Sequence, residues 1–348
     1  MEPLGLLFLT SGLFLGWALG ANDAANVFGT AVGTKMVKWR TAAIICSVFV
    51  ILGAVISGAG ASHTLGKLGA ISALPGAFMT ALSAAVAVYA MTKSGLPVST
   101  SQAIVGAIIG WNLFSGNETD ISTLIKILST WVICPVLSAF IAIALFKILR
   151  FFARHIKLHM LMVDAYTRVG LILAGAFGAY SLGANNIANV VGVFIPASPL
   201  PELQVGTYIV TSTKQLFLLG GLAIAFGVFT YSRGVMMTVG GNLGRLSPTT
   251  AFIAVMSHSI VLIIFASRGL EAWLAGHGLP TIPLVPVSSS QAIVGAIVGI
   301  SILQGATGIH WAVLGKIVAG WIATPFTAGI LCFIGLIFLQ NIFGLVVK

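Results

Sequence analysis

The chain has 348 residues, of which 58% are hydrophobic and only 7% are charged, and its mean hydropathy is +1.08. A soluble domain of this length needs far more charge to cover its surface. The composition therefore excludes that class and predicts an integral membrane protein whose solvent is the lipid bilayer. The net charge of +10 gathers in basic groups beside apolar stretches, as is usual at the cytoplasmic ends of membrane helices, and we expect no nucleic-acid partner.

Ten stretches that are almost free of charge follow one another along the chain. They are residues 4–34, 41–62, 76–92, 94–116, 127–146, 169–195, 208–230, 249–267, 279–303 and 311–338. Each is long enough to cross, or to fold back within, about 30 Å of hydrocarbon, and ten crossings are the working topology. By this count the basic groups at 35–40 and 147–168 share the cytoplasmic side, so the N-terminus is predicted to lie outside.

Two segments of the first half recur in the second half, in the same order. The segment GANDAANVFG, from Gly20, matches GANNIANVVG, from Gly183, at seven of ten positions. The segment that begins at Pro97 matches the one that begins at Pro286 at twelve of fourteen positions. Repeated motifs in a conserved order indicate that one unit has been duplicated.

The duplication predicts two repeats, 1–158 and 159–348, with a basic cytoplasmic linker that begins at about residue 147. Five crossings in each repeat is an odd number, so the second copy must enter the membrane upside down. Inverted repeats are the plan of secondary transporters, whose binding sites lie near the midplane where the repeats meet. We therefore predict an all-α polytopic membrane protein of two inverted repeats, each with about five membrane segments, and with broken or re-entrant helices at the centre.

The first stretch, 4–34, would span about 46 Å as one straight helix, which exceeds the hydrocarbon thickness. We expect a break at 20–26, where a glycine precedes short side chains that can hydrogen-bond their own backbone. The carbonyl groups of an unwound segment, with the side chains of Asn22, Asp23 and Asn26, would form an all-oxygen environment that suits a hard cation such as sodium.

Asp23 is the only acid within any of the apolar stretches. An ionisable group there costs about 3 kcal/mol or more, so we interpret Asp23 as a functional residue. Capping of a broken helix, or pairing with a lysine, is the structural alternative. The corresponding positions of the second repeat hold Asn185, Asn186 and Asn189. Compared with Asp23 in the first motif, Asn186 lacks the negative charge and offers both a hydrogen-bond donor and an acceptor.

The other repeated motif has the features of an anion site. Pro97 and Pro286 suit the first turn of a helix, and hydroxyl and amide side chains follow at the helix start. These are Ser99, Thr100, Ser101, Gln102, Ser288, Ser289, Ser290 and Gln291. Free backbone N–H groups and the positive end of the helix dipole would hold a phosphate or sulfate there, whereas simple N-capping is the alternative. The glycines that follow have the spacing of close helix packing: Gly106, Gly110, Gly295 and Gly299.

Enzymatic chemistry is not indicated. The sequence has no HExxH or GxSxG motif and no pair of acids within the apolar stretches. The six histidines have no paired metal spacing, and we expect loop or interface positions for them. We predict no cofactor, with sodium as the coupling ion.

The motifs GANDAAN at 20–26 and GANNIAN at 183–189, with the two PVS[ST]SQ segments, resemble those of the inorganic phosphate transporter (PiT) family. The resemblance covers essentially the whole chain. It implies a cation-coupled symporter of inorganic phosphate with inverted repeats, commonly driven by sodium or protons and often dimeric. Family members commonly carry an aspartate at the position of Asn186 and a histidine at those of Gln102 and Gln291, so the coupling ion and the anion stay open.

The predicted function is sodium-coupled symport of inorganic phosphate by a multi-pass protein of the cell inner (plasma) membrane. The predicted substrate-binding residues are Asn22, Asp23, Ser99, Thr100, Ser101, Gln102, Asn185, Asn186, Ser288, Ser289, Ser290 and Gln291, and the predicted sodium ligands are Asp23, Asn26, Asn186 and Asn189. A proton-coupled phosphate or sulfate permease of the same family is the alternative, and an anion channel is a more distant one. Expected partners are phosphate, sodium or a proton, the bilayer and, from the resemblance, a second copy in a homodimer.

Overall fold

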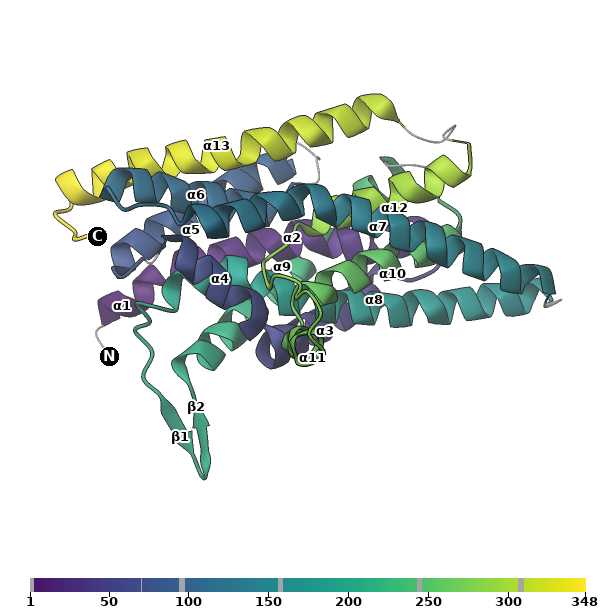
Figure 1. The fold of residues 1–348 in the computed structure, drawn as a ribbon, viewed down its shortest axis with the longest axis horizontal. Coiled ribbons are helices and arrows are strands. Elements are labelled where there is room, and N and C mark those ends of the chain that lie inside the picture. Colours follow the sequence, from purple (N-terminus) through teal and green to yellow (C-terminus); the bar gives the residue numbers. More distant parts are fainter. Residues whose placement is uncertain (1–2, 70, 94–97, 156–158, 243–245, 306–309) are drawn as a thin grey trace.

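The computed structural model describes residues 3–348 except 70, 94–97, 156–158, 243–245 and 306–309, and it is built from helices that run side by side (Figure 1). The α-helices are α1 (Pro3–Phe8), α2 (Thr10–Gly33), α3 (Trp39–Ser57), α4 (Ala59–Gly69), α5 (Leu74–Lys93), α6 (Thr100–Ser115), α7 (Ile121–His155), α8 (Met160–Val191), α9 (Ser212–Asn242), α10 (Pro248–Ile264), α11 (Arg268–Gly276), α12 (Ser289–Leu303) and α13 (Trp311–Asn341). A 3₁₀ turn, η1, follows α8 at Gly192–Phe194. Strands β1 (Leu203–Val205) and β2 (Tyr208–Val210) form an antiparallel hairpin that projects from the bundle.

Within the described residues, seven helices are long and apolar enough to cross a membrane. They are α2 (with the preceding residues from Gly5), α3, α5, α7, α8 (with η1), α9 and α13. The pair α10 and α11, which is bent by 64°, is an eighth candidate if it is counted as one span. The outer helices expose large apolar side chains, among them Phe140 of α7 and Phe326 of α13, as expected where lipid replaces water. The chain is therefore an all-α, multi-pass membrane protein, as its composition predicts.

The working topology of ten full crossings is wrong for two of the apolar stretches. Stretches 94–116 and 279–303 contain α6 and α12, which have 16 and 15 residues. Helices of that length span only about 22–24 Å, less than the hydrocarbon thickness. Both begin inside the protein, because their N-cap residues Ser99 and Ser288 are buried. They are short helices that begin within the protein, in keeping with the broken or re-entrant helices expected at the centre of the fold.

The expected break at residues 20–26 is wrong. α2 continues through this segment without interruption, and α8 likewise passes through the second copy of the motif. A Cβ atom at Gly20 would collide with the backbone oxygen of Ile224 in α9, so the glycine serves close helix packing rather than unwinding. From Gly5 to Gly33 the first stretch forms one candidate span of 29 residues, with α1 and α2 meeting at Leu9, whose backbone is itself in the helical region.

Helices of the first half of the chain pack mainly against helices of the second half. α2 lies along α9, and a Cβ at Gly227 would meet the backbone oxygen of Trp17. α3 lies along α8, and a Cβ at Gly53 would meet the backbone oxygen of Tyr180. Each half thus supplies the packing partners of the other at distances that only glycine permits.

The same exchange joins α6 to α13 and α12 to α7. Gly106 approaches the backbone of Pro325 and Gly295 that of Pro135, which confirms the close packing predicted for these glycines. α7 runs away from the end of the bundle where both termini lie, and its counterpart α13 runs back toward that end (Figure 1). These opposed directions support inverted repeats, while the division into 1–158 and 159–348 stays a prediction.

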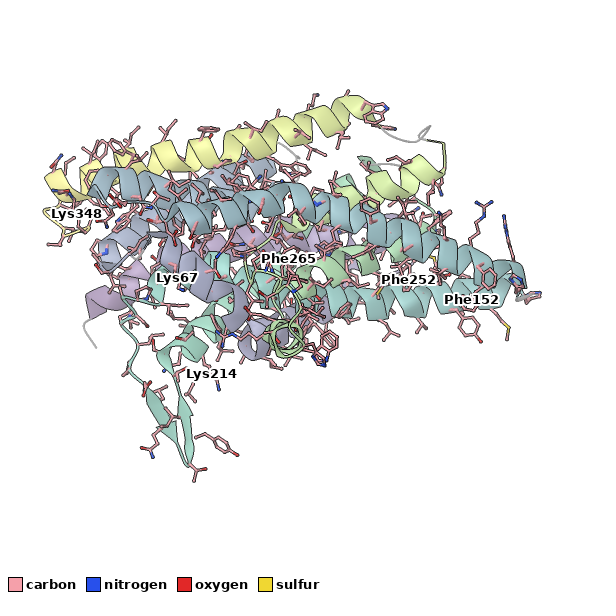
Figure 2. The ribbon with its side chains drawn as sticks, in the orientation of Figure 1. Lys67, Phe152, Lys214, Phe252, Phe265 and Lys348 are labelled. Carbon is pink, nitrogen blue, oxygen red and sulfur yellow. The ribbon has the colours of Figure 1, made fainter. Side chains whose placement is uncertain are left out.

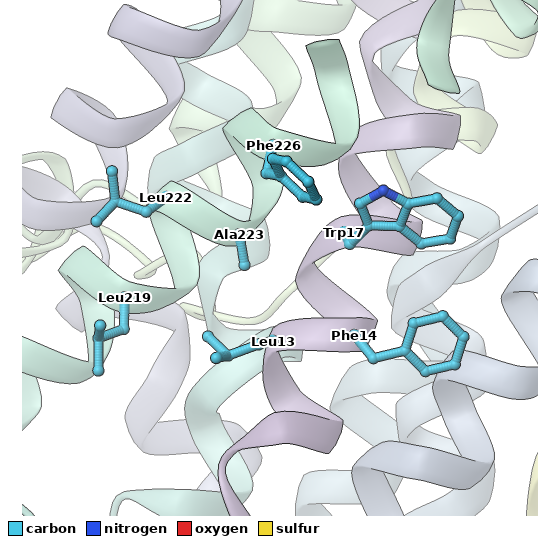
Figure 3. A pocket seen from close by; sticks show the side chains of 7 residues that line it. All are labelled: Leu13, Phe14, Trp17, Leu219, Leu222, Ala223 and Phe226. Atoms are coloured by element: carbon cyan, nitrogen blue, oxygen red, sulfur yellow. The ribbon is translucent and has the colours of Figure 1, made fainter. Parts of the chain in front are cut away.

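An apolar hollow of about 630 Å³ lies on the surface between α2 and α9 (Figure 3). Its lining consists of Leu13, Phe14, Trp17, Leu219, Leu222, Ala223 and Phe226. Trp17 donates its indole N–H to Thr230 Oγ1 at 2.8 Å, so the polar atom of this ring is already bonded. The hollow has the apolar character expected of a surface that faces hydrocarbon.

Replacing Gly53 by alanine should destabilise the protein by about 1–3 kcal/mol, because the added Cβ would press on the backbone of Tyr180. Thermal unfolding in detergent measures the loss as a lower midpoint. Gly315→Ala is the matched control, since nothing lies within 4 Å of a Cβ there and alanine favours a helix more than glycine does. A midpoint for Gly53→Ala equal to that of the control would contradict the close contact of α3 with α8.

Candidate functional site

The two repeated motifs meet in the interior of the bundle, where α6 and α12 begin. The hydroxyl of Ser101, in the first turn of α6, donates to the carbonyl oxygen of Val287, just before α12, at 3.0 Å. Each of the two helix starts also bonds to both α2 and α8. The starts of the two short helices therefore face each other between the motif segments of the two long ones.

Asp23 lies on the α2 side of the site. Its Oδ1 accepts from Asn22 Nδ2 at 2.7 Å and from Asn26 Nδ2 at 3.3 Å. Asn22 also donates to the carbonyl oxygen of Val98, before α6, at 3.2 Å. Asn26 also donates to Ser289 Oγ, at the start of α12, at 3.1 Å. In the part of the chain that the structure describes, no lysine or arginine pairs with the carboxylate, so a structural ion pair does not explain it.

The α8 side has a similar plan without the carboxylate. Asn186 Oδ1 accepts from Asn189 Nδ2 at 3.0 Å and lies 3.4 Å from the Ser101 hydroxyl, to which Asn189 also donates at 2.9 Å. Asn185 instead holds the segment before α12, because its Oδ1 accepts from the N–H of Val287 at 2.8 Å. Asn185 thus positions a helix start, whereas Asn186 and Asn189 bond to the start of α6.

Ser99 and Ser288 are the N-caps of the two short helices. Their hydroxyl oxygens accept from the backbone N–H groups of Gln102 and Gln291, at 3.2 Å in each case. The capping alternative therefore describes what these two serine oxygens do, and it leaves their O–H groups as donors. Earlier N–H groups of each first turn have no acceptor within the helix. The helix starts retain the features of an anion site, which stays a prediction.

Eight polar atoms of the site are buried without a hydrogen-bond partner among the described residues. Five are the amide oxygens of Asn22, Asn26, Gln102, Asn189 and Gln291, and the others are Asn186 Nδ2, Thr100 Oγ1 and His258 Nδ1. Buried polar groups are normally paired, because an unpaired one costs about 1–3 kcal/mol. The site therefore offers mostly acceptors, which suits a cation and a ligand that carries hydrogen-bond donors.

All fourteen predicted site residues are at most 3% exposed, so the site is closed to solvent. Side-chain hydrogen bonds connect Asn22, Asp23, Asn26 and Ser289 on one side and Ser101, Asn186 and Asn189 on the other. Ser99, Ser288 and Ser290 bond within their own helix starts. The side chains of Thr100, Gln102 and Gln291 form no hydrogen bond to another described residue in this arrangement.

His258 joins the site, contrary to the expectation that all histidines occupy loops or interfaces. It lies in α10, it is fully buried, and its Nε2 is 2.9 Å from Ser289 Oγ, which also accepts from Asn26. His258 is the only ionisable residue in the stretch 249–267. The criterion that identified Asp23, a lone ionisable residue at membrane depth, would have identified His258 as well.

A family model for phosphate transporters matches residues 19–272 and 277–346. The chain belongs to the phosphate transporter family. Because this family and the relatives described next are transporters and permeases, the protein is a transporter and not an enzyme.

Members of the phosphate transporter family from archaea and bacteria align with nearly the whole chain. A Pyrococcus furiosus protein, provisionally named a phosphate permease, is 25% identical, and the alignment covers 97% of this chain and 96% of the relative. A sulfate permease of Bacillus subtilis is 29% identical, with 94% of this chain and 84% of the relative covered. A solved structure named a sodium-dependent phosphate transporter has the same fold, with a TM-score of 0.77, 23% identity and coverage of 97% of this chain and 99% of that chain.

In this member of the phosphate transporter family, Ser101→Ala should lower stability by about 1–3 kcal/mol, because Asn189 and Val287 would each lose a buried partner. Ser290→Ala is the matched control, since the Ser290 hydroxyl bonds only within its own helix start, to the Ser288 hydroxyl at 3.1 Å, among the described residues. Thermal unfolding of both variants in detergent provides the comparison. Equal midpoints would show that Ser101 does not join the two helix starts.

Proposed function

We propose that this chain is a secondary active transporter that moves inorganic phosphate together with a coupling cation, with sodium as the first candidate. The observation that carries the proposal is a lone buried carboxylate, Asp23, in one closed site with the starts of α6 and α12. Helix N-termini favour an anion, and the carboxylate favours a cation. The site therefore has a place for each ligand of a symport.

Asp23 makes the two ligands depend on each other. In surroundings of low dielectric constant, an oxyanion beside an ionised carboxylate is strongly repelled. A sodium ion or a proton at the Asp23 side removes this repulsion, so anion binding requires cation binding. The loaded site is then close enough to neutral to stay dehydrated while the protein moves between its two faces.

Phosphate fits the hydrogen-bonding character of the site better than sulfate does. Near neutral pH a phosphate ion still carries a proton and can donate a hydrogen bond, whereas a sulfate ion only accepts. The unpaired groups of the site are mainly acceptors, among them the amide oxygens of Gln102 and Gln291 at the two helix starts. A phosphate O–H can pair with at least one of these acceptors, whereas sulfate can pair with none, which favours the ligand with the donor. Sulfate stays the second candidate because a sulfate permease is among the relatives.

Sodium is favoured by the ligand atoms. The unpaired amide oxygens of Asn22, Asn26 and Asn189, together with the Asp23 carboxylate, are the oxygen ligands that a hard cation prefers. Of the four predicted sodium ligands, Asn186 is the least available, because its oxygen already accepts from Asn189. The solved structure with the same fold carries a name that specifies sodium dependence, which is in keeping with this choice.

A proton is the second candidate for the coupling ion, and a specific contact favours it. His258 shares Ser289 with Asn26, and Asn26 donates to Asp23, so hydrogen bonds link a titratable ring to the acid of the site. A proton held by either group would neutralise the carboxylate or add a positive charge for the anion.

An anion channel is the less favoured class of function. The site is closed to solvent, and it combines helix starts that favour an anion with a carboxylate that favours a cation. Such a closed site suits alternating access around a fixed binding site. The protein would act in the cell inner (plasma) membrane with the bilayer as its solvent. Its assembly as a homodimer stays a prediction.

Uptake of labelled phosphate into proteoliposomes tests the proposal, with sodium and proton gradients imposed separately. Accumulation above the external concentration, driven by sodium and resistant to unlabelled sulfate, is the expected result. Uptake driven only by protons would assign the coupling to the proton, and competition mainly by sulfate would assign the site to that anion. Equilibration without accumulation under either gradient would identify a channel.

Asp23→Asn should reduce gradient-driven phosphate uptake by at least about tenfold, a difference of roughly 1.4 kcal/mol, because the cation loses its charged ligand. The side chains are nearly isosteric, so the variant should fold. Asp164→Asn, at an exposed position of α8, is the control with the same change of charge. Uptake by Asp23→Asn at the normal rate and with the normal cation dependence would refute the coupling mechanism.

His258→Gln distinguishes the two coupling ions, because glutamine can still bond to Ser289 but cannot hold a proton. With sodium as the coupling ion, sodium-driven uptake should stay within about threefold of the unmodified protein, a difference of less than 1 kcal/mol. His277→Gln, at the exposed end of α11, is the matched control. Selective loss of proton-driven uptake in His258→Gln would assign the coupling to the proton.

A further inference from the structure

A second hollow, polar and about 670 Å³ in volume, lies between α4, the start of α7, α11 and the segment before α12. We call this hollow the vestibule. Its charged lining residues are Lys67, Lys126, Arg268, Asp120 and Glu271. The loop-charge topology places Lys67, which follows the first two crossings, on the outer side of the membrane, and the other four residues line the same hollow. The vestibule is distinct from the buried site, with which it shares no lining residue.

The three cations of the vestibule are available to a ligand. Lys67, Lys126 and Arg268 are exposed, and within the described residues none of them forms an ion pair with Asp120 or Glu271. Arg268 donates to the carbonyl oxygen of Ala59 at 2.8 Å, which fixes its guanidinium at the rim of α4. Lys67 is labelled in Figure 2, where it lies on α4. Three cations against two acids give the vestibule a formal net charge of +1.

The acids of the vestibule are partly offset by helix starts. Asp120 precedes α7 and accepts hydrogen bonds from Ser122 and Thr123, through their backbone N–H groups and their hydroxyls. These bonds lower the pKa of Asp120 to about 2, with the Thr123 hydroxyl as the main cause, and they direct the carboxylate toward the helix N-terminus. Glu271 lies in the first turn of α11, where the helix dipole likewise offsets a negative charge. The three cations therefore outnumber two acids whose charge is partly offset.

One segment of backbone separates the vestibule from the buried site. Leu284 lines the vestibule, and Thr64 of α4 donates to its carbonyl oxygen at 2.5 Å. The next residue, Val285, is fully buried and accepts from Asn185 of the site at 3.1 Å. Ser288, the N-cap of α12, follows Leu284 by four residues, which span at most about 14 Å. A ligand in the vestibule therefore waits close to the helix start that is predicted to bind the anion.

We propose that the vestibule captures the transported oxyanion from outside and concentrates it at the entrance to the buried site. The inference rests on the proposed function and names Lys67, Lys126 and Arg268 as its anion-attracting groups. A concave surface whose charge is opposite to that of a ligand raises the association rate by about 10–10³ fold, and the two acids place the vestibule at the lower end of this range. Salt weakens such attraction, since the Debye length falls from about 10 Å at 0.1 M to about 3 Å at 1 M ionic strength.

The test is phosphate uptake into intact cells that lack their own phosphate transporters, because only the outer face meets the substrate there. In the triple variant Lys67→Gln, Lys126→Gln, Arg268→Gln, the KM for phosphate at low ionic strength should rise by about tenfold, the lower end of the steering effect, with Vmax unchanged. Added sodium-free salt should raise the KM of the unmodified protein and leave that of the triple variant nearly constant. Glu271→Gln should have the opposite effect and lower the KM.

Lys214→Gln is the matched control, since Lys214 is an exposed lysine that lies outside the vestibule and is labelled in Figure 2. Its KM should equal that of the unmodified protein. An unchanged KM in the triple variant, or a rise in KM in Lys214→Gln as large as that in the triple variant, would overturn the vestibule proposal. Phosphate uptake by the unmodified protein would still uphold the proposed function in that case. Absence of phosphate uptake by the unmodified protein would overturn the proposed function itself, and labelled sulfate in the same cells would then test the vestibule.

Discussion

A buried carboxylate with no positive partner beside it is the constraint on which the arrangement of the site depends. Among the described residues, Asp23 receives hydrogen bonds only from the amides of Asn22 and Asn26. Its charge must therefore be met by a ligand that enters the site or by a proton. The short length of α6 and α12 also serves the ligand site, because helices that crossed the membrane fully would have their N-termini at the surface. By starting at the depth of Asp23, they bring unpaired N–H groups to the site instead.

Close helix packing is what allows so many polar groups to be buried. Polar backbone and side chains are tolerated at membrane depth only where protein covers them. Gly20 brings α2 against α9 at Ile224, and Asn22, two residues later, bonds to the segment before α6. Packing and binding thus use different faces of the same helical turn. A shift of α2 along α9 would therefore move Asn22 and Asp23 relative to the short helices, which is a physical route from helix movement to ligand release.

The duplicated motifs made the site predictable from sequence. The prediction failed for individual residues whose roles depend on partners elsewhere in the chain. Repetition placed Asp23, Asn186 and both serine clusters in one region, and hydrogen bonds across four helices bring the core of that set together. The role of Gly20 could not be read from its own segment, because its packing partner in α9 lies about two hundred residues away in the chain, at Ile224. The topology was overcounted since hydropathy marks an apolar stretch without showing at which depth its helix begins. His258 was missed because it lies outside the two repeated motifs, although it is a lone ionisable residue in an apolar stretch just as Asp23 is.

The two halves of the site differ in charge, and this difference bears on coupling. The α2 half holds the acid and, through Ser289, the contact with His258, whereas the α8 half presents the unpaired Nδ2 of Asn186 as a donor. An aspartate at position 186 would place a second negative charge beside the helix start that is proposed to bind the anion. In the proposed mechanism, the asparagine avoids that repulsion and offers the anion a hydrogen bond instead. The site therefore has one unit less of negative charge to neutralise than a site with an aspartate in both motifs, so one coupling cation fewer restores the same charge balance.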